Sequence, residues 1–353
     1  MKRNATLCSI LIVASGASYM SWNNTEESGG DAITNVPVFQ ANERDVNMIT
    51  WESPTQSVVA TRRTDAKGDY TWITVTEQPA PQEAPAPDAE VEADVEDSEA
   101  AEATEAPPVE EPIVDVPAPE PTVVSFVGNE TSNKLWKNLS PLRALRALPQ
   151  ADAINEDVLA FEATATALTL GKESGRITLE VGGETYGSKD RFVRNGEQLY
   201  LVDDAMFRPL LSPNSQLVEH RLFPVQEADA ERVDIRRARQ TVGYAQQNKD
   251  DRAQSFWSEV SDPDTENQGA GLWIGKLFRL RVKRYVGQPV EGAQPLFAFT
   301  VHDQAERWDV EILRHTADGQ DTYYARSSLT RGVVELTRSL TADIAEDLDS
   351  VLE

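Results

Sequence analysis

Few residues of this 353-residue chain have the types and spacings that catalysis or metal binding requires. There are three histidines, His220, His302 and His315, and no two of them have a spacing typical of metal ligands. No serine lies in a Gly-x-Ser-x-Gly motif, and no strand is followed by a glycine-rich phosphate loop with a lysine. Cys8 is the only cysteine. The sequence therefore predicts no catalytic residue, no metal and no cofactor.

Carboxylates could still support hydrolysis. Asp203 and Asp204 end a predicted strand, and Glu162 is a further acidic candidate. A hydrolase of this kind would need two acids about 5 to 9.5 Å apart in one cleft. Because aspartate side chains readily accept hydrogen bonds from a first helical turn, we interpret the pair as the N-cap of the next helix.

Two groups of cationic residues are a positive feature of the sequence. The first consists of Lys276, Arg279, Arg281, Lys283 and Arg284, and the second of Arg236, Arg237 and Arg239. The whole chain has 59 acidic and 33 basic residues and a net charge of −26, which argues against general binding to nucleic acid. The cationic residues could pair with carboxylates of the same chain or face an acidic partner. The first group is our candidate interaction surface.

The N-terminus has the pattern of an export signal. Lys2 and Arg3 precede an apolar run over residues 5–20, which is shorter than the roughly 20 residues that cross a bilayer comfortably. We predict that residues 1–22 are a signal anchor or a cleaved signal peptide, and that residues 23–44 are a tether. Since positive residues stay inside, the chain would be a single-pass inner-membrane protein with its bulk in the periplasm, or an exported protein after cleavage.

Residues 77–121 differ sharply in composition from the rest. They contain 15 acidic residues, no Lys or Arg, no aromatic residue and ten of the 20 prolines. Such a segment cannot bury enough apolar surface to offset its ordering entropy, so we predict a disordered, extended insertion.

Two stretches begin with Leu-Trp, at 134–148 and 271–286. In the first, Leu135, Leu139, Leu142 and Leu145 have the spacing of one helix face, although Pro141 could instead begin the helix with Ser140 as its cap. The second could be a helix, or a strand where Phe278, Leu280 and Val282 alternate with Arg and Lys. Residues 330–352 are predicted to form an amphipathic terminal helix.

Spacings between similar residues indicate an internal duplication. Trp72 to Trp257 is an offset of 185 and Trp136 to Trp273 one of 137, and the difference of 48 is close to the 45 residues of the 77–121 insertion. Later pairs keep the smaller offset, 131 for Ile177 to Trp308 and 132 for Phe192 to Tyr324. We predict an α+β fold of two similar modules, 46–223 and 231–353. Each would have a mixed or antiparallel sheet with its helices on one face.

Several stretches resemble a bacterial family, domain of unknown function 4340. They include Phe126-Val-Gly-Asn, the Pro-Leu-Arg-Ala-Leu-Arg-Ala-Leu run, Asp190-Arg-Phe-Val-Arg and Leu217-Val-Glu-His-Arg-Leu. The likeness covers about 46–223 and, more weakly, the rest. It implies an envelope protein with one N-terminal anchor, sometimes found with transporter or gliding-motility components. It implies no activity and no functional residues, and the acidic insertion departs from the family's compact form.

These observations favour a non-enzymatic, membrane-anchored extracytoplasmic interaction or scaffold protein with a protein partner in the cell envelope. Two alternatives remain open. One is a hydrolase of envelope polymers that uses paired carboxylates. The other is a periplasmic ligand-binding protein, which would need a deep, largely apolar pocket between the modules. Nothing in the sequence fixes an oligomeric state.

Overall fold

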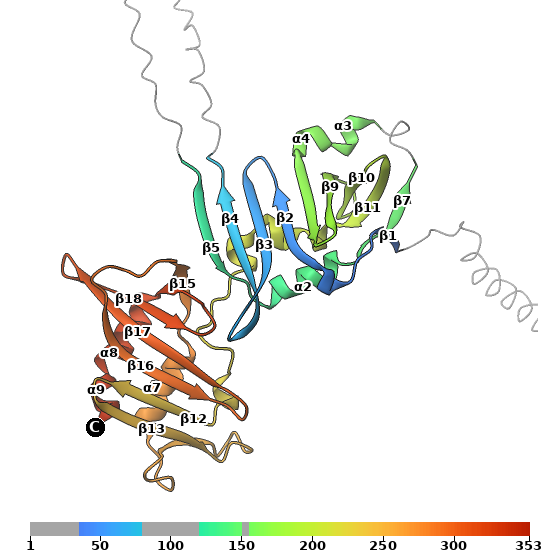
Figure 1. Cartoon of the computed structure of the whole chain (residues 1–353). Coiled ribbons are helices and arrows are strands. Elements are labelled where there is room, and N and C mark those ends of the chain that lie inside the picture. The colour runs from blue at the N-terminus through green and yellow to red at the C-terminus, as the bar shows by residue number, and fades with distance from the viewer. Residues whose placement is uncertain (1–34, 80–119, 150–154) are drawn as a thin grey trace, which may run out of the picture.

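The computed structural model describes residues 35–79, 120–149 and 155–353, which form two large antiparallel sheets with helices packed against them (Figure 1). The α+β class expected from the sequence is confirmed at this level. The predicted signal segment, 1–22, lies outside the described residues, as does most of the 77–121 insertion. Among the residues described, no helix is both long and apolar enough to cross a membrane.

The first sheet has nine strands. Their order across the sheet is β5 (Thr122–Val127), β4 (Gly68–Glu77), β3 (Gln56–Asp65), β2 (Val46–Glu52), β8 (Thr166–Lys172), β9 (Gly175–Glu184), β10 (Asp190–Asn195), β11 (Gln198–Asp203) and β7 (Arg146–Leu148). Alternate residues of the central strands are buried, which is the two-residue period expected of a sheet with one covered face.

Helix α2 (Glu130–Leu139) covers the buried face of this sheet. Asn129 caps the helix by accepting a hydrogen bond from the Ser132 backbone N–H at 3.2 Å. Leu135, Trp136 and Leu139 join the first core. Three short helical segments, η3 (Asp204–Met206), α5 (Arg208–Leu211) and α6 (Pro213–Gln216), add Phe207 and other apolar residues to it. The remaining short helices are η1 (Glu43–Asp45), α3 (Glu156–Leu159), α4 (Phe161–Thr164) and η4 (Glu227–Asp229).

The second sheet has eight strands. Their order is β14 (Phe256–Glu259), β13 (Gln240–Gln247), β12 (Arg232–Arg237), β16 (Gln294–His302), β17 (Arg307–Ala317), β18 (Gln320–Ser327), β19 (Val333–Leu336) and β15 (Val282–Tyr285). Helices α7 (Gln268–Phe278), α8 (Arg338–Glu346) and α9 (Leu348–Leu352) lie behind these strands in Figure 1 and complete the second core.

A very short connection joins the two cores. Val218 packs into the first core and Leu222 into the second, so the second core begins before the predicted boundary at 231. The connection also bonds to both sheets, because the Glu219 N–H donates to the Val127 carbonyl at 2.9 Å and the Val282 N–H donates to the His220 carbonyl at 2.8 Å. The modules are therefore tied together through backbone hydrogen bonds as well as through the chain.

The ends of the insertion lie side by side. Glu77, the last residue of β4, is the ladder partner of Thr122, the first residue of β5. The expectation that residues 77–121 leave and re-enter the first module at neighbouring points is confirmed.

Three predicted elements were wrong. The helix expected over 134–148 ends at Leu139, and Pro141 is followed by the strands β6 (Leu142–Ala144) and β7. The terminal helix expected over 330–352 begins at Arg338, because β19 occupies its first part. The tether expected over 23–44 includes β1 (Val36–Phe39), which pairs with β6 and buries Phe39 in the first core.

The two tryptophan matches are each displaced by one residue. Trp257 is buried opposite Gln246, whereas the half-buried Trp72 points to the outer face and its neighbour Thr71 is buried opposite Arg62. In the helices, the buried positions of α7 follow those of α2 at an offset of 138, which places Trp273 over Leu135. Identical residue types had suggested an alignment that the side-chain faces contradict.

Candidate functional site

The first cationic group lies at the end of α7 and along β15. Lys276 pairs with Asp347 at 2.6 Å, while Lys283 and Arg284 both pair with Glu335 at 2.6 and 2.5 Å. The remaining two residues bond to backbone carbonyls of α7 and the turn that follows it, Arg279 to Gly275 and Arg281 to Phe278 and Leu280. Each of these five residues has a partner within its own module, and only Lys283 and Arg284 share one.

Glu335 holds the centre of this group. Its side chain is only 7% exposed, and it accepts hydrogen bonds from both Lys283 and Arg284. Burial alone would raise the pKa of the Glu335 carboxyl, but the two hydrogen bonds and the two positive charges outweigh it and leave the pKa lowered. The cations here stabilise a buried carboxylate.

The second cationic group is also paired in part. Arg236 lies 3.7 Å from Asp309, and Arg237 pairs with Asp349 of α9. The sequence left two interpretations open for these cations, pairing within the chain or contact with an acidic partner. Pairing within the chain accounts for the contacts seen here.

The carboxylates considered for hydrolysis have other partners. Asp203 accepts the Ala205 N–H at 2.9 Å and caps η3, as predicted. Asp204 is buried and pairs with Arg191 at 2.7 Å. Glu162 lies exposed on α4. None of the three lines the cavities described below.

Two of the three histidines make defined contacts. His220 bonds through Nδ1 to the Val282 carbonyl at 2.9 Å, and His302 lies 2.8 Å from Asp234. Within the described ranges no group of three or more His, Cys, Asp or Glu side chains could hold a metal ion.

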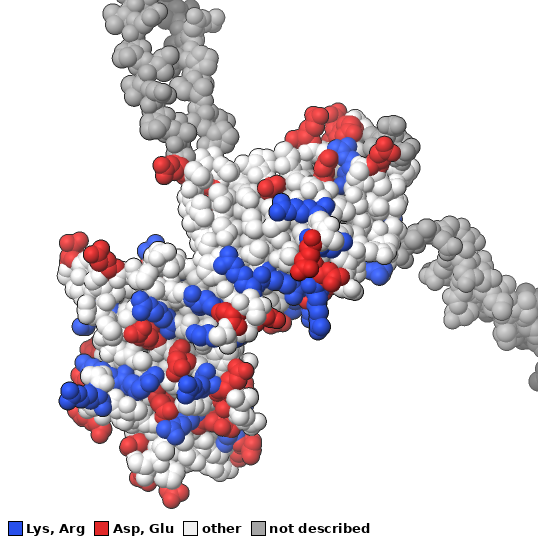
Figure 2. All heavy atoms as spheres, in the orientation of Figure 1, with Lys and Arg blue, Asp and Glu red and all other residues white. Residues whose placement is uncertain are grey.

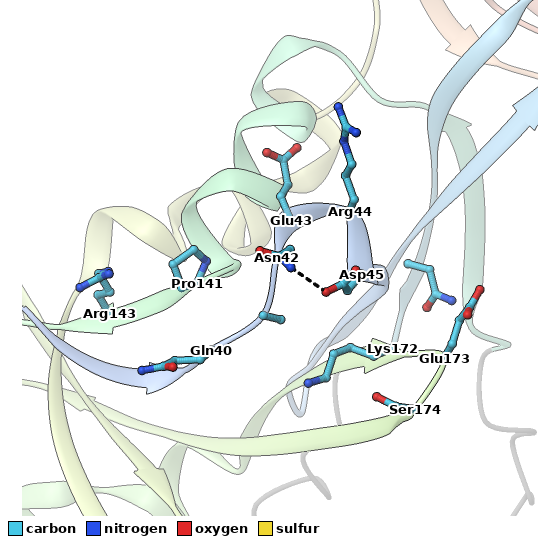
Figure 3. A pocket seen from close by; sticks show the side chains of 12 residues that line it. Gln40, Asn42, Glu43, Arg44, Asp45, Pro141, Arg143, Lys172, Glu173 and Ser174 are labelled. Carbon is cyan, nitrogen blue, oxygen red and sulfur yellow. Dashed lines mark hydrogen bonds between the residues drawn. The ribbon is translucent and has the colours of Figure 1, made fainter.

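One cavity is a basin of about 910 Å³ beside η1 (Figure 3). Its charged lining residues are Arg44, Arg143, Lys172, Glu43, Asp45 and Glu173. Some of these charges have partners, since Glu43 pairs with Arg62 at 3.1 Å and Asp45 accepts from Asn42 at 3.2 Å. With three cations and three anions, the lining favours neither anionic nor cationic ligands.

A smaller cavity of about 490 Å³ lies where the modules meet. Asp65 and Lys67 of the β3–β4 turn line one side, and Arg326 and Arg331 line the other. Arg331 pairs with Asp65 at 3.2 Å and lies 4.5 Å from the centre of the Tyr70 ring. Ala66, Pro289 and Val333 also line it, so the cavity combines charged and apolar side chains.

The outer face of the first sheet is a candidate site that sequence reasoning missed. Its ladder rows run across β5, β4 and β3. The eight outward residues that are at least partly exposed are Val123, Thr76, Ser57, Ser125, Thr74, Val59, Trp72 and Thr61, and a ninth outward residue, Val127, is buried. None of the nine is charged. The row through Thr74 continues across three more strands as Thr50, Thr169 and Thr178. We call these eight exposed residues the neutral face, and Arg63 borders it beside Trp72.

The corresponding face of the second sheet is charged. Asp234, Arg236, Asp309, Glu311 and Arg326 point outward from its central strands and form ion pairs with one another or with adjacent side chains. Figure 2 shows the contrast, with a broad uncharged area on the module that contains β2–β5 and alternating acidic and basic side chains on the other. The signal available in the sequence was the alternation of Thr, Ser and Val in these strands.

The chain thus consists of two antiparallel α+β modules in direct contact, the first with a neutral outer face. Residues 127–295 match the family described as Domain of unknown function (DUF4340), which confirms the family resemblance. The match runs from the end of β5 through the junction to the start of β16, so it begins later than the expected 46 and extends further into the second module than 223. Comparison with curated proteins and with solved structures found no match.

Proposed function

We propose that this protein is a non-enzymatic, membrane-anchored interaction or scaffold protein of the bacterial cell envelope. The observation that carries the proposal is the neutral face of the first sheet. In a chain with a net charge of −26, eight adjacent exposed or partly exposed positions without a charge form a surface on which a protein partner could pack without desolvating ions.

The chemistry of the neutral face suits a protein partner. It combines small hydroxyl and β-branched side chains with Trp72, which packs edge-on against Tyr70 at a ring-centre distance of 6.5 Å and under Arg63 at 5.1 Å. Thr74 and Ser125 hydrogen-bond to each other across the strands at 2.9 Å, so each hydroxyl already has a partner within the sheet. Depletion of charged residues and an aromatic anchor such as Trp72 are features of the buried centre of protein interfaces.

The cationic group around Glu335 is better explained as internal pairing, as described above. The proposed partner therefore contacts the first module, and the cations stabilise the second. By its family resemblance the protein would be an accessory of an envelope transporter or of a gliding-type complex.

The location is part of the same proposal. Residues 1–22 would be a single N-terminal anchor, with the remainder in the periplasm, or a signal that is cleaved on export. Fractionation of cells and N-terminal sequencing of the mature protein decide between the two forms. A cytosolic, unprocessed protein would contradict both.

We also propose that the two modules arose by duplication. Their strand orders correspond from β4 to β7 and from β14 to β15, with β5 as an extra edge strand. Both helices have an Asn cap 138 residues apart, Asn129 and Asn267, and Leu142-Arg-Ala recurs as Leu280-Arg-Val at the same offset. Ile177 opposes Leu170 as Trp308 opposes Val301. Superposing the two modules of an experimental structure at these offsets tests the idea. Ladder positions that do not coincide would contradict it.

The functional test is affinity capture of the full-length anchored protein from membranes. Thr74→Lys places a charge in the middle of the neutral face and should reduce the captured partner by about tenfold or more, because the charge must be desolvated on binding. Thr241→Lys, on an exposed position of β13, is the matched control and should capture as much as the wild type. Equal capture by wild type and Thr74→Lys would contradict the neutral face as the site.

A further inference from the structure

Strand β5 ends the first sheet and has an open backbone edge. The Gly128 N–H donates to the Thr71 carbonyl of β4, so the alternation of an antiparallel ladder turns the backbone groups of Val123 and Ser125 away from β4. At Val127 the carbonyl that points away from β4 already accepts the Glu219 N–H, as described. Over the described residues no backbone group pairs with Val123 or Ser125, and the Val123 side chain is 59% exposed.

The other three edges of the two sheets are protected. The outermost strand β7 carries Arg146, β15 carries Lys283 and Arg284, and β14 carries Glu259 with Ser258 bridged to Glu266. Charges on edge strands prevent pairing with other chains. Strand β5, with the sequence Thr-Val-Val-Ser-Phe-Val, has neither a charge nor a proline. It is the one edge of these two sheets that retains the ability to add a strand.

Two carboxylates lie beside the start of this edge. Glu77 ends the neighbouring strand and Glu120 lies two residues before β5. The whole chain is also acidic, with a net charge of −26. A cationic chain is attracted to this edge, whereas a second copy brings the same negative charge with it.

We propose that the β5 edge binds an extended strand of a partner protein, a strand with a neutral, β-branched centre and Lys or Arg on its flanks. This proposal rests on the interaction function proposed above and names the mode of binding. The partner strand bonds to the free N–H and C=O groups of Val123 and Ser125, and its alternate side chains extend the neutral face by one strand. Glu77 and Glu120 beside the edge favour the cationic flanks.

The probe for the test is the peptide Lys-Lys-Thr-Val-Thr-Val-Thr-Lys-Lys with the full-length protein. It should bind, slow hydrogen exchange at the Ser125 amide, and lose affinity as salt is raised, because the attraction is partly ionic. Two matched peptides are the controls, one with Glu in place of every Lys and one with Pro in place of the central Thr. Each should bind about tenfold more weakly or worse, the first by repulsion and the second by loss of a ladder hydrogen bond.

Two protein variants complete the test. Val123→Pro removes only a donor on the open side and should reduce binding about tenfold or more with little effect on the β4–β5 ladder. Val123→Lys keeps that donor and places a cation on the edge, which should repel the Lys-flanked peptide. This variant replaces Val123→Pro in the test if the proline variant folds poorly.

The proposal is overturned if the Lys-flanked peptide gives no protection at Ser125, if both variants bind it like the wild type, or if sedimentation shows that a second copy occupies the edge. A membrane partner captured equally by wild type and Val123→Pro would overturn the β5 edge while leaving the proposed interaction function intact.

Discussion

Glu335 is the shared partner of two of the five cations in the second module. Its carboxylate is buried and pairs with Lys283 and Arg284, both of which are mainly exposed. Removing the carboxylate would leave these two cations without the charge that offsets their repulsion. The three-residue cluster is therefore more sensitive to a change at position 335 than to the loss of either cation.

We predict that Glu335→Gln lowers the free energy of unfolding at pH 7 by about 1–3 kcal/mol, the usual cost of losing charged hydrogen bonds at a buried site. Because the pKa of Glu335 is lowered in the folded state, its contribution is present above the unfolded pKa and is lost as pH falls through the folded pKa. Urea unfolding at pH 7 and at low pH should show a smaller pH dependence in Glu335→Gln than in the wild type. An unchanged pH dependence would contradict this role.

At the scale of elements, both main helices begin with the same device. The Asn129 side chain accepts the Ser132 N–H, and the Asn267 side chain accepts the Ala270 N–H at 2.9 Å. Asn267→Ala should destabilise by about 1 kcal/mol, since it leaves a backbone donor without its cap. Asn129→Ala should cost more, because the Asn129 amide also donates to the Gln216 and Val218 carbonyls. Denaturant unfolding measures the losses, and Asn138→Ala, at an exposed position of α2, is a control for general effects of the substitution. A loss at 267 no larger than that at 138 would show that the cap itself contributes nothing.

The sequence predicted the strands well because their signals are local. Runs rich in β-branched and aromatic residues, together with the turns at 65–68, 195–196 and 318–319, identified the hairpins β3–β4, β10–β11 and β17–β18. The terminal strand β19 was missed because all four of its residues are buried and no alternation is visible. Leu142 is buried as it would be in a helix, so the leucine spacing could not distinguish the helix from the strand β6 that follows Pro141.

The candidate sites were harder to predict because they depend on pairing across the chain. The five cations were identified, but their main partners Glu335 and Asp347 are more than 50 residues away in sequence. The neutral face requires knowing that β5 returns beside β4 after the acidic insertion. Thr74 and Ser125, 51 residues apart, become neighbours only in that arrangement.

At the scale of the whole molecule, the two modules are in direct contact at a small interface. Phe126 of the first module packs against Tyr285 of the second at a ring-centre distance of 6.1 Å, and the Tyr285 hydroxyl donates to the Glu219 carbonyl at 3.0 Å. Burial raises the pKa of the Tyr285 hydroxyl, so it remains a donor at physiological pH. This contact lies at the far end of β5 from the start of that strand. A partner strand added at Val123 therefore leaves the junction untouched.

The acidic insertion should be separable from the folding of either module. Replacing residues 80–119 with Gly-Gly removes 13 of the 59 acidic residues and no basic ones, which changes the net charge from −26 to −13. Because Glu77 and Thr122 are already ladder partners, a short turn can connect them, and shortening the loop should leave stability unchanged or raise it by up to about 2 kcal/mol. Thermal and urea unfolding measure this. The contrasting variant is a deletion of residues 135–148. It removes Leu135, Leu139 and Leu142 from the first core and should unfold the first module. A marked loss of stability on replacing 80–119 would mean that the insertion contributes to the core.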